Sequence, residues 1–248
     1  MKNLRNIKIT VSYDGTSYCG WQTQKNGQSI QQEIERAIYE LTGENTKIIG
    51  SGRTDAGVHA NGQVANFLTS CSIPAKNFAK ALNTHLPNDI RIGYSEQVDL
   101  SFNARKSAKK KTYSYKFYCG ESENALLYRY ATYIKDKPDM ERFRRAGFLM
   151  QGEKDFKCFM ASGSSVKSTV RTVYSVDVIE RDNLVEVLVC GNGFLYNMVR
   201  SMVGTMLKFA YGKIDESDIK KMFSSGDRKI VGKTMEAKGL TLKSVEYN

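Results

Sequence analysis

One short segment, Ser51–Ala60, brings together a carboxylate, an arginine and glycines at a spacing that suits a reactive loop. Glycine lets a backbone turn sharply and approach a ligand closely. Arg53 stands two residues before Asp55, and a neighbouring guanidinium can hold a carboxylate ionised. Strand-like runs flank the segment at 46–50 and 63–68, so we expect Asp55 in a loop between two strands. From these residues alone, an aspartate in a glycine-bounded turn is more commonly ordinary turn chemistry than a catalytic group.

Carboxylate chemistry is favoured because other reactive groups are few. The chain has two histidines, His59 and His85, and neither has a Ser or Cys at the spacing of an activated nucleophile. The five cysteines are scattered and form no Cys-x-x-Cys pair, which indicates free thiols and argues against a zinc site. Gly226–Thr234 departs from the spacing of a phosphate loop, and Gly50–Gly52 lacks the third glycine of a dinucleotide fingerprint. We therefore expect no cofactor and no metal.

The charge of the chain predicts a polyanionic partner. Lys and Arg total 37 against 26 for Asp and Glu, which gives a net charge of +11. Cationic side chains that neutralise phosphates release condensed counterions, so RNA, DNA and anionic lipid are all candidates. Lipid is the weakest, because no apolar run approaches the roughly 18 residues of a spanning helix. The segment 1–9 lacks the apolar core of a signal peptide, so we expect a cytoplasmic location.

A basic cluster precedes an aromatic run near the middle of the chain. The cluster comprises Arg105, Lys106, Lys109, Lys110 and Lys111, and the aromatic residues are Tyr113, Tyr115, Phe117 and Tyr118. Cationic charge beside aromatic faces suits splayed or single-stranded nucleotides. The alternative interpretation is a half-buried strand that follows a solvated loop, and the residues alone favour this alternative.

Hydrophobic periodicity predicts an α+β fold with antiparallel pairing rather than a doubly wound parallel sheet. The predicted helices are Ser29–Leu41, Ala75–Leu82, Met140–Met150 and Tyr196–Tyr211. The predicted strands are Ile7–Tyr13, the two runs that flank Asp55, Ile90–Val98, Thr112–Tyr118, Val170–Ile179, Leu184–Cys190 and Leu240–Tyr247. The first helix has the strongest signal, since Ser29 and Gln32 stand at the positions of a capping box and Gly43 follows the helix.

Several motifs resemble one enzyme family. The string Gly-Arg-Thr-Asp-Ala-Gly-Val-His at 52–59 resembles the signature of the tRNA pseudouridine synthase A family, whose motif carries the catalytic aspartate. Ser101–Arg105 and the Tyr-x-Tyr at 113–115 are similar to two further family segments, and Met198–Gly204 is similar to the family's Met-Val-Arg-x-x-Val-Gly helix. Other similar segments lie at 12–16, 21–22, 86–90 and 168–172, so the resemblance covers essentially the whole chain.

The resemblance implies a role for each matching residue. Asp55 is implied as the catalytic nucleophile or base, and Arg200 as the arginine that pairs with it. Arg53 is implied as the residue that fills the space left by an extruded base, and Tyr113 as the ring that stacks on the target base. We also expect four cationic residues to bind RNA: Arg105, Lys109, Lys110 and Lys111.

Two positions depart from the family pattern. Asn103 stands where the family usually has His, which affects a local contact. The segment 234–240 lacks the proline that usually precedes Gly239-Leu240, and the missing proline could alter a loop near the site.

For the architecture, we expect two ferredoxin-like or RRM-like α/β halves that share a mostly antiparallel central sheet, with the active-site cleft between them. Residues 1–105 are expected to form the half with the catalytic Asp loop. Residues 106–248 are expected to form the half with the base-stacking tyrosine and the arginine helix.

The function that the resemblance implies is isomerisation of uridine to pseudouridine at positions 38, 39 and 40 of the tRNA anticodon stem-loop. The target base is flipped out, its C1′–N1 bond breaks, and the uracil rejoins through C5. Asp55 either attacks C1′ or removes the C2′ proton. The resemblance also implies a homodimer that binds tRNA. Two other functions fit the residues: a non-catalytic RNA-binding or chaperone module, and a carboxylate-dependent nucleoside glycosylase.

Overall fold

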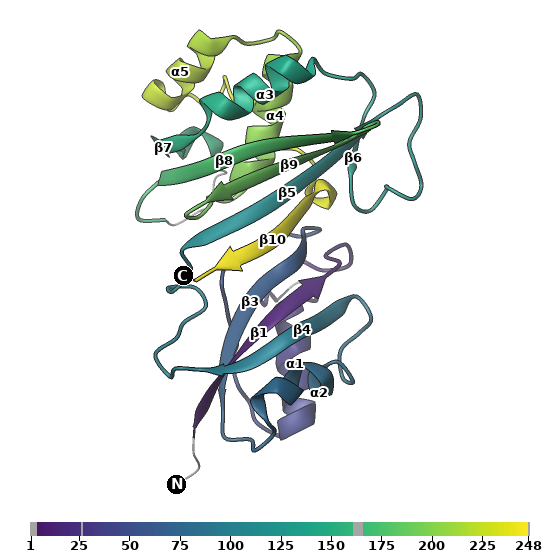
Figure 1. Cartoon of the computed structure of the whole chain (residues 1–248), viewed down its shortest axis with the longest axis vertical. Helices are drawn as coiled ribbons and strands as arrows, with labels where there is room; N and C mark the ends of the chain where they lie inside the picture. Colours follow the sequence, from purple (N-terminus) through teal and green to yellow (C-terminus); the bar gives the residue numbers. More distant parts are fainter. Residues whose placement is uncertain (1–3, 26, 161–165, 248) are drawn as a thin grey trace. The chain divides into compact units, whose positions relative to one another are not determined.

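The protein is represented by a computed structural model that describes residues 4–25, 27–160 and 166–247. The chain forms two compact units (Figure 1). Unit 1 comprises Met1–Lys109 and Thr241–Asn248, and unit 2 comprises Lys110–Leu240. None of the helices within the described residues is long and apolar enough to cross a membrane.

The sheet of unit 1 is mostly antiparallel. Its strands are β1 (Arg5–Tyr13), β2 (Ile49–Gly50), β3 (His59–Thr69), β4 (Ile90–Val98) and β10 (Leu240–Glu246). β1 lies between β3 and β4 and is antiparallel to both. β2 is antiparallel to β3, whereas β10 is parallel to it and pairs Thr241 with His59. The last strand of the chain therefore lies beside the start of β3.

Two helices cover one face of this sheet (Figure 1): α1 (Ile30–Thr42) and α2 (Phe78–Leu82), the latter preceded by the 3₁₀ turn η1 (Ala75–Asn77). The Ser29 hydroxyl accepts from the Gln32 amide and the Gln32 side chain accepts from the Ser29 amide, so the predicted capping box is confirmed. Alternate residues of β1 and one side of α1 are fully buried and form the core of the unit.

Unit 2 also has an antiparallel sheet, in the order β5 (Lys110–Cys119), β9 (Leu184–Gly191), β8 (Val170–Arg181) and β7 (Gly152–Asp155). A short strand, β6 (Thr132–Ile134), pairs parallel with β5. The helices are α3 (Met140–Leu149), α4 (Met198–Ala210) and α5 (Glu216–Ser225), with 3₁₀ turns η2 (Lys157–Phe159) and η3 (Ala237–Gly239).

The core of unit 2 joins the helices to the sheet. Phe117 of β5 meets Phe143 of α3 edge to face, with ring centroids 5.5 Å apart. Almost every residue of α4 is buried. A Cβ added at Gly204 of α4 would collide with the Lys233 carbonyl, and a Cβ added at Gly232 would collide with the Gly204 carbonyl. The segment 232–235 is thus packed tightly along α4.

The expected α+β class and the mostly antiparallel pairing are confirmed in both units. The sequence did not predict β6, β7 or α5. The helix predicted from Tyr196 begins at Met198, because Asn197 has a left-handed backbone with φ of 62°. The strand expected over 46–50 is limited to Ile49–Gly50.

Candidate active site

The Asp55 loop connects β2 to β3 in unit 1, so the expected position between two strands is confirmed. Asp55 is half-buried, while the neighbouring Arg53 is exposed. The turn after the aspartate is closed by the Val58 amide, which donates to the Asp55 carbonyl at 3.1 Å. Gly57 permits this turn because its φ is +75°, in the left-handed region that glycine tolerates.

Thr54, directly before the aspartate, is held by residues from the end of β1 and the loop after it. The Tyr13 and Thr54 hydroxyls lie 2.8 Å apart, and the Trp21 amide donates to the Thr54 carbonyl at 3.1 Å. Burial raises the pKa of the Tyr13 phenol well above its usual range, so this hydroxyl stays protonated. A Cβ at Gly20 would collide with the Thr54 carbonyl. The backbone that carries Asp55 therefore has little freedom to move.

The N-terminal end of the loop has a separate anchor. The buried Ser51 hydroxyl donates to the Gln63 side-chain oxygen at 2.6 Å, and the Gln63 amide nitrogen donates to the Gly52 carbonyl at 3.0 Å. Gln63 lies on β3, so this anchor ties the loop to the sheet. Arg53 stands between the two anchored points and is exposed to solvent.

His59, the last residue of the motif, is buried and contacts the loop after β1. The Gly15 amide donates to His59 Nδ1 at 3.1 Å, and Asp14 Oδ1 lies 3.2 Å from the same nitrogen. Gly15 packs against the Val58 carbonyl with no room for a Cβ. His59 therefore joins two loops. His85 lies elsewhere, 3.2 Å from Glu40 of α1.

The Ser101–Arg105 segment is fixed to the same unit by two buried asparagines. Asn66 Oδ1 accepts from the Ala104 amide at 2.8 Å, and Asn6 Nδ2 donates to the Phe102 carbonyl at 3.0 Å. Asn103 caps a short turn, because its Oδ1 accepts from the amides of Arg105 and Lys106. The asparagine that departs from the family pattern thus shapes the turn that exposes Arg105.

Tyr113 lies on β5 of unit 2, and its side chain is 9% exposed. Its ring meets Phe194 edge to face, with centroids 5.2 Å apart and planes at 88°. Such an arrangement favours this orientation of the ring. The expectation of a strand with alternating aromatics is therefore confirmed for this segment.

Arg200 lies on the first turn of α4, and its guanidinium is held at two points. Nε donates to the Met235 carbonyl at 2.6 Å, and an Nη donates to Asn197 Oδ1 at 2.8 Å. Arginine suits such a position because it stays charged when it is partly desolvated.

The segment after Met235 is also fixed, despite the missing proline. The Tyr115 hydroxyl lies 2.9 Å from the Glu236 carbonyl and 2.7 Å from the Thr132 hydroxyl. Burial raises the pKa of the Tyr115 phenol above its usual range, so the proton is retained for these contacts. Glu236 has φ of −59°, which is the value that proline imposes. The backbone has a proline-like conformation at this point without the proline.

The predicted RNA-binding lysines lie along the chain where unit 1 gives way to unit 2. Lys109 and Lys110 are exposed and Lys111 is half-buried. The Lys110 ammonium lies 5.6 Å from the ring centre of Tyr174. Of the predicted residues, Arg53, Asp55, Arg105 and Lys109 thus belong to unit 1, and Lys110, Lys111, Tyr113 and Arg200 to unit 2.

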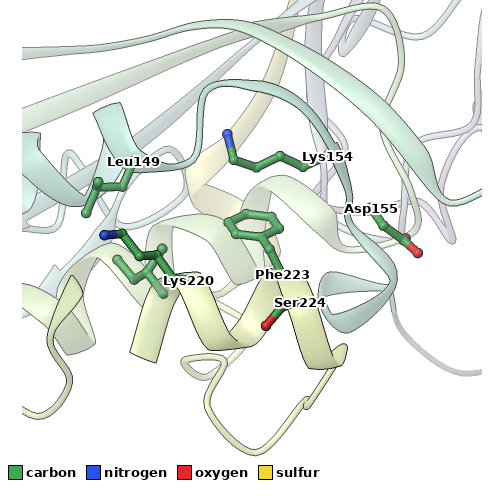
Figure 2. Close-up of a pocket in the computed structure, with 7 residues that line it drawn as sticks. Leu149, Lys154, Asp155, Lys220, Phe223 and Ser224 are labelled. Carbon is green, nitrogen blue, oxygen red and sulfur yellow. The ribbon is translucent and has the colours of Figure 1, made fainter. Parts of the chain in front are cut away.

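Unit 2 also has a cavity of about 390 Å³ among α3, β7 and α5 (Figure 2). Its lining includes none of the predicted site residues. The Lys154 side chain extends over the Phe223 ring, with the ammonium 5.5 Å from the ring centre, and burial lowers the pKa of this lysine. Within the described ranges, no group of three or more His, Cys, Asp or Glu side chains could hold a metal ion.

Sequence comparisons place these residues in a known context. The profile of the tRNA pseudouridine synthase family matches residues 9–105 and 146–248. The chain is 46% identical to a tRNA pseudouridine synthase A of Acetivibrio thermocellus and 42% identical to that of Ruminiclostridium cellulolyticum. It is also 46% identical to tRNA pseudouridine synthase A 2 of Clostridium perfringens. Each comparison covers 98% of this chain and 100% of the relative.

Proposed function

Because the chain belongs to the tRNA pseudouridine synthase family, we propose that it is an isomerase that converts uridine to pseudouridine in tRNA. We place its targets at positions 38, 39 and 40 of the anticodon stem-loop. The observation that carries the proposal is the anchored Asp55 loop: Thr54 is bound from two sides, and Ser51 and Gly52 are tied to Gln63. A fixed backbone suits a carboxylate that must meet one atom of a sugar.

The reaction begins with base flipping, since the reactive ribose and base atoms are out of reach within a stem. Extrusion of a stacked base costs about a few kcal/mol. The hydrogen bonds that hold the loop are made by Ser51, Gly52 and Thr54, and the side chain of Arg53 is exposed to solvent. In the proposal, this side chain fills the space that the flipped base leaves. Asp55 then acts as nucleophile at C1′ or as base at C2′.

The bond changes need no redox partner and no water. On the nucleophilic route, an ester of Asp55 with C1′ forms as the C1′–N1 bond breaks, and the ester breaks again when C5 of the rotated uracil bonds to C1′. On the other route, Asp55 takes the C2′ proton as the C1′–N1 bond breaks and returns it after the C1′–C5 bond has formed. The proton of C5 is then lost and N1 becomes protonated, so substrate and product have the same atoms. Tyr113 stacks on the uracil during rotation, and its edge-to-face contact with Phe194 supports a fixed ring plane.

Arg200 is proposed as the cation that keeps Asp55 ionised. The two hydrogen bonds of its guanidinium, to Met235 and Asn197, support this role because they orient a permanently charged group. In this proposal residues 1–105 supply the aspartate, and residues 106–248 supply the tyrosine and the arginine.

Further parts of the proposal concern binding. Arg105, Lys109, Lys110 and Lys111 contact tRNA phosphates, which is supported by the exposure of the first three and by the net charge of +11. We also propose a homodimer in the cytoplasm, because the resemblance implies a dimer and the substrate is tRNA.

The test is the variant Asp55→Asn, assayed for tritium release from tRNA labelled at C5 of uridine. We expect turnover to be lost while tRNA affinity stays within about tenfold of the wild type, since the carboxylate supplies chemistry rather than phosphate contacts. Retained turnover would refute the role of Asp55. Chromatography of the products separates the glycosylase alternative, which releases free uracil.

A further inference from the structure

A loop joins β5 to β6 in unit 2 (Figure 1), and several of its large side chains are exposed to solvent. Leu126 is 88% exposed, Tyr128 is 58% exposed and Tyr130 is 49% exposed. Large side chains with this exposure, grouped within five residues, are typical of a contact surface. Arg129, between the two tyrosines, is exposed as well.

The ring of Tyr128 makes a cation–π contact with Lys238. The Lys238 ammonium lies 4.7 Å from the ring centre and 3.2 Å from the Glu236 carboxylate. The ring thus has a cation over it, and more than half of the tyrosine's surface is still exposed to solvent. An aromatic ring next to a positive charge is a combination that binds an unpaired nucleotide, because every nucleotide has a base with a π-face and a phosphate.

Lys238 is connected to the Arg200 site by a short, fixed segment. The Met235 carbonyl accepts from Arg200, and the Glu236 carbonyl accepts from the Tyr115 hydroxyl. Gly239, directly after Lys238, packs against the Tyr115 ring with no room for a Cβ. Three residues span at most about 11 Å, so the Cα atoms of Lys238 and Met235 are no further apart than this.

We propose that Tyr128 and Lys238 form a second RNA-contact surface, distinct from the pocket for the target uridine. The base of an unpaired nucleotide of the tRNA stacks on the exposed part of the Tyr128 ring, and the phosphate of that nucleotide contacts the Lys238 ammonium. This proposal rests on the proposed function, because it names a further part of the same substrate. It assigns the surface to tRNA affinity, with no part in bond cleavage.

The charges of the loop indicate which end meets RNA. Glu121 and Glu123 lie in its first part, where they line a hollow together with Asp182. These carboxylates repel phosphate, whereas Arg129, at the other end of the loop, attracts it. Lys238 adds a second cation beside Tyr128, and the Glu236 carboxylate offsets part of its charge. The RNA therefore contacts the end of the loop with Tyr128.

The test compares three variants in tRNA binding and turnover. Tyr128→Ala is expected to raise KM for tRNA about tenfold with kcat within twofold, since removal of one stacking ring has an effect of this size. Tyr128→Phe keeps the ring and is expected to stay within twofold of the wild type. Tyr39→Ala is the control, because Tyr39 is 53% exposed on α1 of unit 1 and belongs to neither site.

The outcomes separate this proposal from the proposed function. If the wild type forms pseudouridine and Tyr128→Ala has unchanged KM, the second surface is refuted and the proposed function stands. If Tyr128→Ala changes the sedimentation of the protein but not its affinity for tRNA, the loop is a protein interface and the proposal is wrong. If the wild type forms no pseudouridine, the proposed function falls. Binding of tRNA to Asp55→Asn with and without Tyr128→Ala then tests the surface alone, and equal affinities overturn it.

Discussion

Arg200 donates from Nε to the carbonyl oxygen of Met235 at 2.6 Å. The bond joins the first turn of α4 to a segment that follows it by more than thirty residues, and it leaves the guanidinium only a narrow range of orientations. The glycine packing of 204 and 232 draws the same two segments together. Helix packing and side-chain orientation are thus coupled at this point.

The first prediction concerns the planar fork of this arginine. Arg200→Lys keeps the charge but has no Nε to bind Met235, so we expect kcat to fall about 100-fold with tRNA affinity nearly unchanged. Single-turnover kinetics at saturating enzyme measure the effect. Arg142→Lys is the matched control, because Arg142 also donates from Nε to a carbonyl, that of Phe209, at 3.2 Å. An equal loss in both variants would contradict a role for Arg200 in the reaction.

The second prediction concerns the missing proline. Glu236→Pro fits the existing φ of −59° and retains the carbonyl that accepts from Tyr115. Proline restricts the unfolded chain, and the exposed Glu236–Lys238 ion pair that it removes contributes little, so we expect stability to rise by about 0.4 to 1 kcal/mol with kcat preserved. Denaturant unfolding measures the change. A large loss of stability would show that the Glu236 amide, or the ion pair of its carboxylate with Lys238, is needed for folding.

The third prediction concerns the restraint on Thr54. Gly20→Ala places a Cβ against the Thr54 carbonyl at a φ of +107°, so the variant loses stability and the Asp55 loop is displaced. Gly43→Ala is the control, since Gly43 has φ of +71° with open space around it. We expect the control to lose about 1 to 2 kcal/mol of stability without a change in kcat.

The comparison of the two glycine variants isolates the contact with the loop. Gly20→Ala is expected to lose more stability than the control and to lower kcat in the fraction that stays folded. Thermal unfolding and active-site-normalised turnover give the two quantities. If Gly20→Ala retains full kcat, the position of Thr54 is unimportant for the reaction.

The fourth prediction concerns the basic cluster. Charge reversal at Lys109, Lys110 or Lys111 is expected to weaken tRNA binding and to reduce the slope of log K against log salt by roughly 0.7 to 0.9 for each phosphate that the variant no longer neutralises. Lys80→Glu, on α2, is the control, because Lys80 is exposed and outside the proposed surface. An unchanged slope in the cluster variants would show that these lysines do not contact phosphate.

Local signals in the sequence predicted much of the fold. Ser29, Gln32 and Gly43 marked α1 to within one residue at each end, because its caps are made by residues next to it. The sequence did not predict β7, because the residues Gly152–Asp155 do not alternate between apolar and polar. This segment is a strand only because it pairs with β8. α5 is capped by Asp215 with Asp218 at the third helical position, where the usual signal is Glu or Gln.

The sequence predicted which residues belong to the candidate site, but it did not predict most of the contacts that hold them in place. The motif around Asp55 was recognised by resemblance, but the contacts of Thr54 with Tyr13 and Trp21 join residues more than thirty positions apart. A pattern of neighbouring residues in the sequence cannot predict contacts between residues so far apart. The cap that Asn103 forms is local, because its side chain accepts from the amides two and three residues further on. Asparagine is a common turn residue for this reason, so the sequence could have predicted the turn.

The parallel pairing of β10 with the first residues of β3 has a consequence for synthesis on the ribosome. Unit 1 takes its final strand from a part of the chain that is translated after all of unit 2. During translation, the strand that pairs with His59 is therefore absent until the whole of unit 2 has been synthesised. A polypeptide stalled short of residue 241 leaves that edge of the first sheet unpaired and open to wrong partners.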